Sequence, residues 1–151
     1  MDELIQQFNQ HRIRYLLIGG QTMRLFGMPR FSMDWDFFIP PRDPENFQRL
    51  NQLLDEELRE PILPLGPRGE NFVQTYQTSW GVIQFHLKLP GVPSFEAAEA
   101  QSATCLTEHG TKVKCLSRPN MLTAKEAANR PQDQQDIAFL KVLLQSPDSP
   151  K

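Results

Sequence analysis

Two aspartates stand two residues apart in the sequence MDWDFFI, where their other neighbours are apolar or aromatic. The composition of residues 33–39 predicts a strand. Because side chains along a strand alternate between its faces, Asp34 and Asp36 are expected on one face. The other face would carry Met33, Trp35 and Phe37. Two unpaired carboxylates repel each other and resist burial, whereas a divalent cation removes both difficulties. The pair therefore predicts a site for Mg²⁺, or for Mn²⁺ in its place.

A pair of glycines, Gly19 and Gly20, follows a short apolar run at residues 15–18 and precedes a segment of helical length that ends near Gly27. The apolar run is too short for a buried helix and predicts a buried strand. Glycines at such a junction let backbone N–H groups approach a triphosphate, and the start of the helix adds a favourable dipole. Taken alone, the same two glycines are equally typical of a tight turn.

A second strand with one polar face is predicted for residues 81–89. Its apolar positions are Ile83, Phe85, Leu87 and Leu89, and its polar face carries Gln84, His86 and Lys88. This alternation is typical of a half-buried strand. A lone histidine on a strand is more often structural than catalytic, so Gln84 and His86 are accessory candidates only.

The remaining pattern predicts the elements that must position these residues. Helices are expected at residues 1–11, 20–27, 44–59, 95–103 and 117–129, and from Pro131 onward with Ile137, Leu140 and Leu144 facing inward. Further strands are expected at residues 71–76, 104–106 and 112–116. This order predicts an α/β (α+β) protein with a mixed, mainly antiparallel sheet covered by helices. Residues 1–145 would form a single domain, and residues 146–151 a frayed tail.

The composition is that of an ordinary globular protein. The chain has 151 residues, 39% of them hydrophobic and 23% charged, with a formal net charge of −2. Such a charge provides no overall positive field for nucleic acid, although it allows a local basic groove. No stretch approaches the roughly 20 apolar residues of a membrane helix. These features predict a cytoplasmic protein without a membrane partner, in which Cys105 and Cys115 remain reduced.

Two segments of the chain resemble the nucleotidyltransferase (polymerase-beta-like) superfamily. The first is GGQTMRLFGMPRFSMDWDFFI, in which thirteen residues separate the two glycines from the D-x-D motif, and the second is LTAKEAANRPQDQQDIAFL. The chain is most similar to the small bacterial and archaeal domains of this superfamily, which include toxin-like members of toxin–antitoxin pairs. The resemblance covers most of residues 1–144 and implies a nucleotidyltransferase-like fold.

The resemblance also implies a set of functional residues. Asp34 and Asp36 would bind one or two Mg²⁺ ions and act as the catalytic carboxylates. Gly19, Gly20, Arg30 and Lys125 would contact the nucleotide, an NTP. For Arg30, a solvated loop arginine is an equally good interpretation. Residues Arg130, Asp133 and Asp136 recur at three-residue intervals, which is also typical of a helix cap with surface ion pairs.

The sequence departs from the family pattern at the third carboxylate. The position that matches it on the later strand is Gln84, which binds Mg²⁺ poorly and cannot act as a general base. His86 could accept a proton in its place, and Glu70 is a weaker substitute. Two hypotheses follow. The protein either transfers NMP to a hydroxyl of a protein, tRNA or small molecule, or is a catalytically degenerate module that binds nucleotide or a protein partner.

The chain is too short to contain the additional helical domain with which larger relatives hold their acceptors. An antitoxin-like protein or a second copy of the chain, in a homodimer, is therefore a candidate to complete the cleft.

Overall fold

A computed structural model of the protein describes residues 1–145, and the predicted frayed tail at 146–151 lies outside them. The strands are β1 (Leu16–Ile18), β2 (Trp35–Phe38), β3 (Val73–Thr78), β4 (Gly81–His86), β5 (Ala103–Leu106) and β6 (Lys112–Cys115). The helices are α1 (Asp2–Gln10), α2 (Gly19–Leu25), α3 (Pro44–Leu53), α4 (Phe95–Ala100), α5 (Arg118–Ala128) and α6 (Gln134–Gln145), and a 3₁₀ turn, η1 (Pro131–Asp133), precedes α6.

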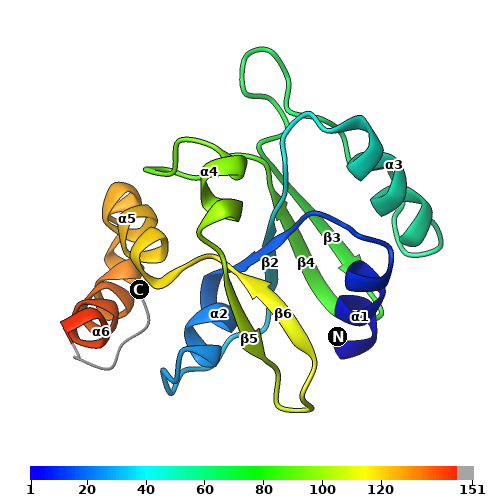
Figure 1. Ribbon diagram of the computed structural model, residues 1–151. Helices are drawn as coiled ribbons and strands as arrows, with labels where there is room; N and C mark the ends of the chain where they lie inside the picture. Colours follow the sequence, from blue (N-terminus) through cyan, green and yellow to red (C-terminus); the bar gives the residue numbers. More distant parts are fainter. Residues whose placement is uncertain (146–151) are drawn as a thin grey trace.

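The six strands form one mixed sheet in the order β3-β4-β2-β1-β6-β5 (Figure 1). Antiparallel pairs join β1 to β2, β3 to β4 and β5 to β6, whereas β2 pairs with β4 and β1 with β6 in parallel. The predicted fold class is therefore confirmed. None of the described helices is long and apolar enough to cross a membrane.

Each face of the sheet has its own hydrophobic core. On one face, buried residues of α1 and α3 pack against the inward side chains of β2 and β4, among them Phe37 and Phe85. On the other face, α2, α4, α5 and α6 contribute buried residues, with Phe38 and Leu116 from the sheet side. Figure 1 shows α5 and α6 together at one side of the molecule and α1 and α3 at the opposite side. The residues predicted to form the functional site lie on the face that α5 and α6 cover.

Alternation along β4 is as the sequence predicts up to Leu87. The prediction is wrong at its end, because β4 stops at His86 and Leu89 packs in the second core instead of the first. Ile83, Phe85 and Leu87 are buried in the first core, while Gln84 and His86 are only partly buried on the other face. Two helices begin with a side-chain cap: Asp43 accepts a hydrogen bond from the backbone of Asn46 at the start of α3, and Ser117 starts α5 in the same way. Strands β5 and β6 pair as an antiparallel hairpin, and Cys105 and Cys115 on it are free thiols.

The strand predicted at 33–39 begins two residues later than expected. Met33 is 72% exposed and lines a cleft, so its predicted place on the buried face beside Trp35 is wrong. The reason lies in the neighbouring strands. Trp35 is the first residue of β2 that pairs with β4, and β1 stops opposite Asp36 because the chain turns there into α2. Residues before Trp35 therefore have no ladder partner and remain outside the sheet.

Helix α3 ends at Leu53 rather than at Arg59 as predicted. The backbone N–H groups of Glu57 and Leu58 both donate to the carbonyl of Leu54, which starts a separate turn. Helix α4 is also shorter than predicted, because Ala103 pairs with Cys115 in the sheet. In α6 the residue that continues the core face is Leu143 and not Leu144.

Phe37 is the centre of the aromatic packing and provides a test of the fold. Its ring lies 5.3 Å from that of Phe8, 5.8 Å from Tyr15 and 6.0 Å from Phe85, measured between centroids. We expect Phe37→Ala to lower the free energy of unfolding by about 3–5 kcal/mol in urea denaturation. Phe31→Ala is the matched control, because Phe31 is 82% exposed. Equal losses in both variants would contradict this packing.

Candidate functional site

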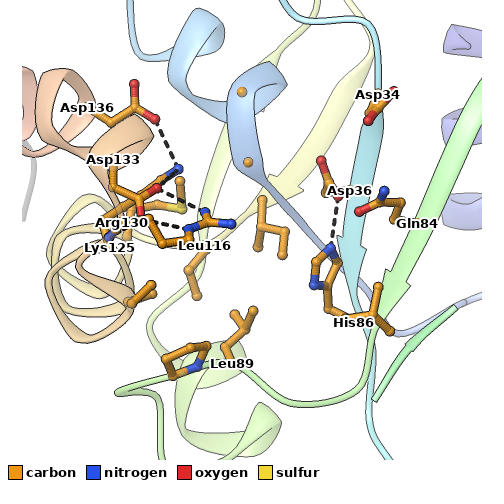
Figure 2. A pocket seen from close by; sticks show the side chains of 18 of the residues that line it. Asp34, Asp36, Gln84, His86, Leu89, Leu116, Lys125, Arg130, Asp133 and Asp136 are labelled. Atoms are coloured by element: carbon orange, nitrogen blue, oxygen red, sulfur yellow. Dashed lines mark hydrogen bonds and ion pairs between the residues drawn. The ribbon is translucent and has the colours of Figure 1, made fainter. Parts of the chain in front are cut away.

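A cleft of about 1230 Å³ lies between the sheet and the C-terminal helices. Its walls come from the β1–α2 turn, the segment before β2, the polar face of β4 and the facing surfaces of α5 and η1. Figure 2 shows Asp34 and Asp36 on the sheet side and Lys125, Arg130 and Asp133 on the opposite side of this space. The sequence-predicted glycines, carboxylates and polar strand residues therefore line one common cavity.

The turn at Gly19 lies directly against the carboxylate of Asp36. Antiparallel pairing places Ile18 opposite Asp36, so the next residue of the chain passes over the aspartate. Gly19 has φ +76°, and a Cβ atom there would lie only 2.8 Å from Asp36 Oδ2. A side chain is thus excluded by both the backbone conformation and the lack of space. The two glycines form more than a tight turn, because they leave backbone exposed beside a carboxylate.

Gly20 makes a similar close approach to the segment before β2. A Cβ atom at this position would lie 2.5 Å from Ser32 Oγ. The same segment is held to α2 by the side chain of Gln21, which donates to the Ser32 carbonyl at 2.9 Å. These contacts fix the stretch that leads to Asp34. Helix α2 has only seven residues, so the helix dipole expected from the sequence would be small here.

Asp36 has a defined partner on the neighbouring strand. His86 Nε2 lies 2.8 Å from Asp36 Oδ1, and both side chains are largely buried. Gln84 lies directly beside Asp36 in the parallel register of β2 and β4. One oxygen of Asp36 is therefore occupied by the imidazole, and the other faces Gly19. Figure 2 shows this arrangement.

The donor set fits a magnesium ion that shares its coordination with a substrate. Within residues 1–145 there is no group of three His, Cys, Asp or Glu side chains that could enclose a metal. Mg²⁺, however, usually keeps several waters and binds through one or two carboxylates plus substrate phosphates. Asp34 and Asp36 provide those carboxylates, and Gln84 offers an amide oxygen in place of a third. The site suits a metal brought with a phosphate and lacks a complete protein cage.

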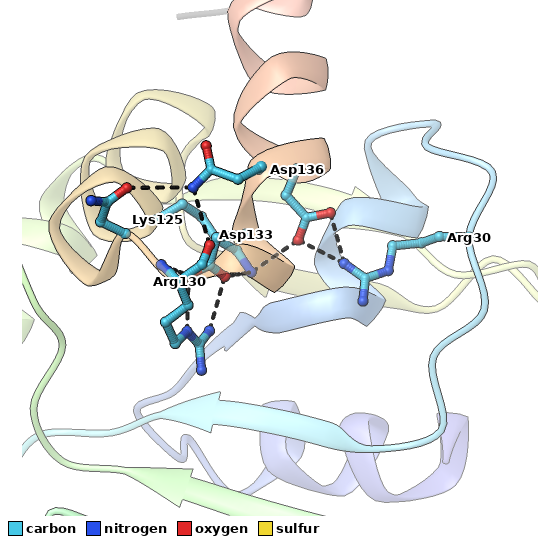
Figure 3. A network of polar contacts seen from close by, with 7 residues as sticks. Arg30, Lys125, Arg130, Asp133 and Asp136 are labelled. Carbon is cyan, nitrogen blue, oxygen red and sulfur yellow. Dashed lines mark hydrogen bonds and ion pairs between the residues drawn. The ribbon is translucent and has the colours of Figure 1, made fainter.

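Arg30 and Lys125, the two predicted phosphate contacts, are both bound to Asp136. Arg30 Nη1 lies 2.8 Å and 2.6 Å from the two Asp136 oxygens, and Lys125 Nζ lies 3.0 Å from Oδ2 (Figure 3). Asp136 is only 2% exposed. The carboxylate thus joins the segment before β2 to α5 and α6, and it neutralises cations that would otherwise be available to phosphate.

A second buried carboxylate, Asp133, organises the start of α6. Arg130 donates to it through Nε at 2.8 Å and Nη2 at 2.9 Å, and Lys125 Nζ lies 3.4 Å away. The backbone N–H of Arg130 also bonds to Asp133, which completes a cap of η1. The hydrogen bonds from Arg130 hold the pKa of this carboxyl below its ordinary 3.8. The cap and ion pairs anticipated from the sequence are present, but both aspartates are buried rather than at the surface.

Comparison with known proteins identifies the fold. No family model matches the chain, and no curated protein matches it in sequence. Among solved structures, the lincosamide antibiotic adenylyltransferase LnuA with bound lincomycin superposes with a TM-score of 0.62 and 18% identity, covering 92% of each chain. A protein from Thermotoga maritima assigned as a nucleotidyltransferase gives 0.64 at 11% identity, over 94% of this chain and 88% of that one.

A third structure agrees with these two. An antigenic nucleotidyltransferase-like protein from Paracoccidioides brasiliensis superposes with a TM-score of 0.59 and 20% identity, over 99% of this chain and 76% of that chain. The chain has the nucleotidyltransferase fold. The superfamily fold expected from the sequence is thereby confirmed, across almost the whole chain.

Several residues of this nucleotidyltransferase-fold cleft were missed by the sequence analysis. Four exposed residues of this kind line the cleft: Phe31, Met33, Arg68 and Phe72. All four lie in segments without regular structure. No periodicity marks Phe31, Arg68 or Phe72, and the strand periodicity placed Met33 on the wrong face. Only the pairing of β3 with β4 brings the loop before β3 to the cleft. Glu70, the weaker substitute for the third carboxylate, is not among the lining residues, because its carboxylate is turned back toward its own loop near Arg68 and Gly66.

Asp133 gives this nucleotidyltransferase fold a measurable pH dependence. Its folded-state pKa is lowered, so its contribution to stability is complete at neutral pH and is lost as the pH falls through about 4 and below. We expect Asp133→Asn to lower the free energy of unfolding by about 3 kcal/mol at pH 7. Urea denaturation from pH 7 to pH 3 should show this difference shrink as the pH falls.

The matched control for that experiment is Asp55→Asn, at an exposed aspartate that forms no ion pair with another described residue. A constant difference between wild type and Asp133→Asn over this range would contradict the assignment.

Proposed function

We propose that the protein is a Mg²⁺-dependent nucleotidyltransferase that transfers NMP from an NTP to a hydroxyl group and releases pyrophosphate. The observation that carries this proposal is the close approach of the Gly19 turn to the Asp36 carboxylate, which leaves no room for a Cβ atom, inside a cleft that also contains Asp34. Phosphoryl transfer requires charge neutralisation and positioning more than covalent chemistry. A free glycine backbone next to two carboxylates is suited to both requirements.

In this proposal the triphosphate lies on the β1 side of the carboxylates. The backbone N–H groups of Gly19 and Gly20 would donate to its oxygens, because these residues carry no side chain of their own. Asp34 and the Asp36 oxygen that faces Gly19 would hold the metal, assisted by Gln84. When bound, Mg²⁺ would neutralise the phosphate charge. Arg30 and Lys125 would act mainly through Asp136, to which both are bound.

His86 is the proposed general base. Its Nε2 is engaged with Asp36, which orients the ring and leaves Nδ1 to accept the proton of the attacking hydroxyl. Gln84 cannot do this, because an amide does not take up a proton near neutral pH. The hydrogen bond from the imidazole to a carboxylate is an arrangement that many enzymes use to position a histidine base.

The comparisons bear on one class of acceptor. LnuA is named as an adenylyltransferase of lincosamide antibiotics, which supports a small molecule as one acceptor class besides a protein or tRNA. A cytoplasmic location stays a prediction from the composition. An antitoxin-like partner and a homodimer stay predictions from the resemblance and the length of the chain.

A second function is favoured by one observation. Gln84 occupies the position next to Asp36 where a third carboxylate would complete the metal site. A protein with this substitution would retain nucleotide binding and lose transfer, and would then act as a nucleotide-binding module.

Removing the Asp36 charge tests nucleotide binding, which both functions require. We expect Asp36→Asn to weaken Mg²⁺-dependent NTP binding by more than about tenfold, because the metal loses one of its two carboxylates. Isothermal titration calorimetry with each of the four NTPs, with Mg²⁺ and with EDTA, measures this effect. Asp55→Asn is the control and should bind as wild type does.

Transfer itself separates the two functions. If the protein is an enzyme, wild type should attach label from α-³²P-NTP to a component of a cell extract. His86→Ala should reduce the rate by about 10²–10⁴-fold while NTP affinity is retained. His109→Ala, at an exposed histidine outside the cleft, should have no effect.

The binding module predicts the opposite pattern. Wild type should then transfer no label with any NTP, and Gln84→Glu should create or increase activity, because it restores a carboxylate beside Asp36. Unchanged activity in His86→Ala would contradict the role of His86 as the base.

A further inference from the structure

The cations that line the cleft fall into two groups. Arg30, Lys125 and Arg130 are bound to the buried carboxylates of Asp133 and Asp136. Arg68 and Lys88 also line the cleft, are exposed, and form no ion pair or side-chain hydrogen bond with any other residue in the described range 1–145. A cation that is free of internal partners is available to a ligand, whereas a cation held by a buried acid is largely neutralised.

These two free cations lie on one side of the carboxylate pair. Lys88 follows the end of β4 by two residues and lines the cleft together with Gln84 and His86. Arg68 lies in the loop before β3, and the backbone N–H of Leu87 donates to the carbonyl of Phe72 at 2.8 Å, so this loop reaches the end of β4. In the sheet order, β4 and β3 lie on one side of β2, and β1 with the glycine turn lies on the other.

An aromatic side chain accompanies the free cations. Phe72 lines the cleft and is 55% exposed, in direct contact through its backbone with the residue before Lys88. An exposed phenylalanine in the same cleft as an arginine and a lysine is suited to stacking with a flat ring whose phosphate contacts the cations. The carboxylate of Glu70 accepts a hydrogen bond from the backbone N–H of Arg68 at 3.4 Å, but it forms no ion pair with either cation and does not line the cleft.

The reaction geometry assigns this region to the acceptor. In phosphoryl transfer the attacking and leaving oxygens are roughly in line, on opposite sides of the phosphorus. If pyrophosphate leaves toward Gly19 and Gly20, the hydroxyl must approach from the β4 and β3 side. His86, the proposed base, lies on β4 between the carboxylates and Lys88.

We propose that Arg68, Phe72 and Lys88 form an acceptor subsite for a nucleotide unit, with the phosphate on the two cations and the base on Phe72. This inference rests on the proposed function, because it uses the direction of transfer. A phosphate next to a flat base is present both in a free mononucleotide and at the end of an RNA chain, and binding measurements with each distinguish the two.

Binding of a 5′-fluorescein 12-nucleotide RNA with a free 3′-hydroxyl, followed by anisotropy over a range of salt concentrations, tests the RNA source. Arg68→Gln/Lys88→Gln should weaken binding at least about tenfold and reduce the salt slope by about 1.4, since each lost contact with a single strand removes about 0.7. Phe72→Ala should weaken binding by about tenfold. Titration with AMP by calorimetry, on the same variants, tests the mononucleotide source.

The matched control is Lys112→Gln/Lys114→Gln, which removes two exposed lysines on β6 that do not line the cleft. It should leave binding of both probes unchanged. Loss of AMP binding alone in Arg68→Gln/Lys88→Gln would identify a free nucleotide as the acceptor, and loss of RNA binding would identify a chain end.

Three results would overturn the proposal: binding of neither probe by wild type, equal losses in the β6 control, or no loss in the cleft variant. Calorimetry with Mg²⁺-NTP separates failure of the acceptor subsite from failure of the proposed function. If the nucleotidyltransferase proposal is right, Arg68→Gln/Lys88→Gln should bind NTP as wild type does, whether or not the acceptor subsite exists. Selective loss of NTP binding would place the two cations on the triphosphate and would also contradict the acceptor subsite.

Discussion

The site depends above all on the antiparallel pairing of β1 with β2, which sets Ile18 opposite Asp36. This register carries the chain from β1 across the aspartate as it enters α2, and only glycine can occupy the first position of that crossing. A shift of one residue would turn Asp36 to the other face of the sheet and separate it from the glycine turn. Every other part of the proposed chemistry is positioned relative to this contact.

The four aspartates around the cleft fall into two pairs that differ in their basic partners. Asp133 and Asp136 are buried and each binds two basic side chains, so the corner formed by α5, α6 and the segment before β2 is held by internal ion pairs. Asp34 and Asp36 have no basic partner apart from His86 among the described residues. The first pair of acids holds the fold through internal ion pairs, and the second is the pair to which we assign the metal. This contrast in ion pairing could not be predicted from the spacing of the acids in the sequence.

Much of the site could be predicted from residues 15–40 and from the alternation along β4, because both signals are local. The prediction of a polar face with Gln84 and His86 is correct for the same reason. Burial of Asp136 against Arg30 could not be predicted, since 106 residues separate the partners. Nor could the place of Arg68 and Phe72, which only the pairing of β3 with β4 determines. Met33 was misplaced because its side of the strand depends on where β1 ends.

The central claim is that a metal-bound nucleotide lies between the glycine turn and Asp36. The most direct measurement is the NMR broadening of backbone amide signals when Mn²⁺ is added together with an NTP, in place of Mg²⁺. The account predicts that the amide signals of Gly19, Gly20 and Gln84 broaden strongly, while those of α3, on the opposite face of the sheet, do not. Broadening centred on another region, or none at the glycine turn in the presence of both ligands, would contradict it.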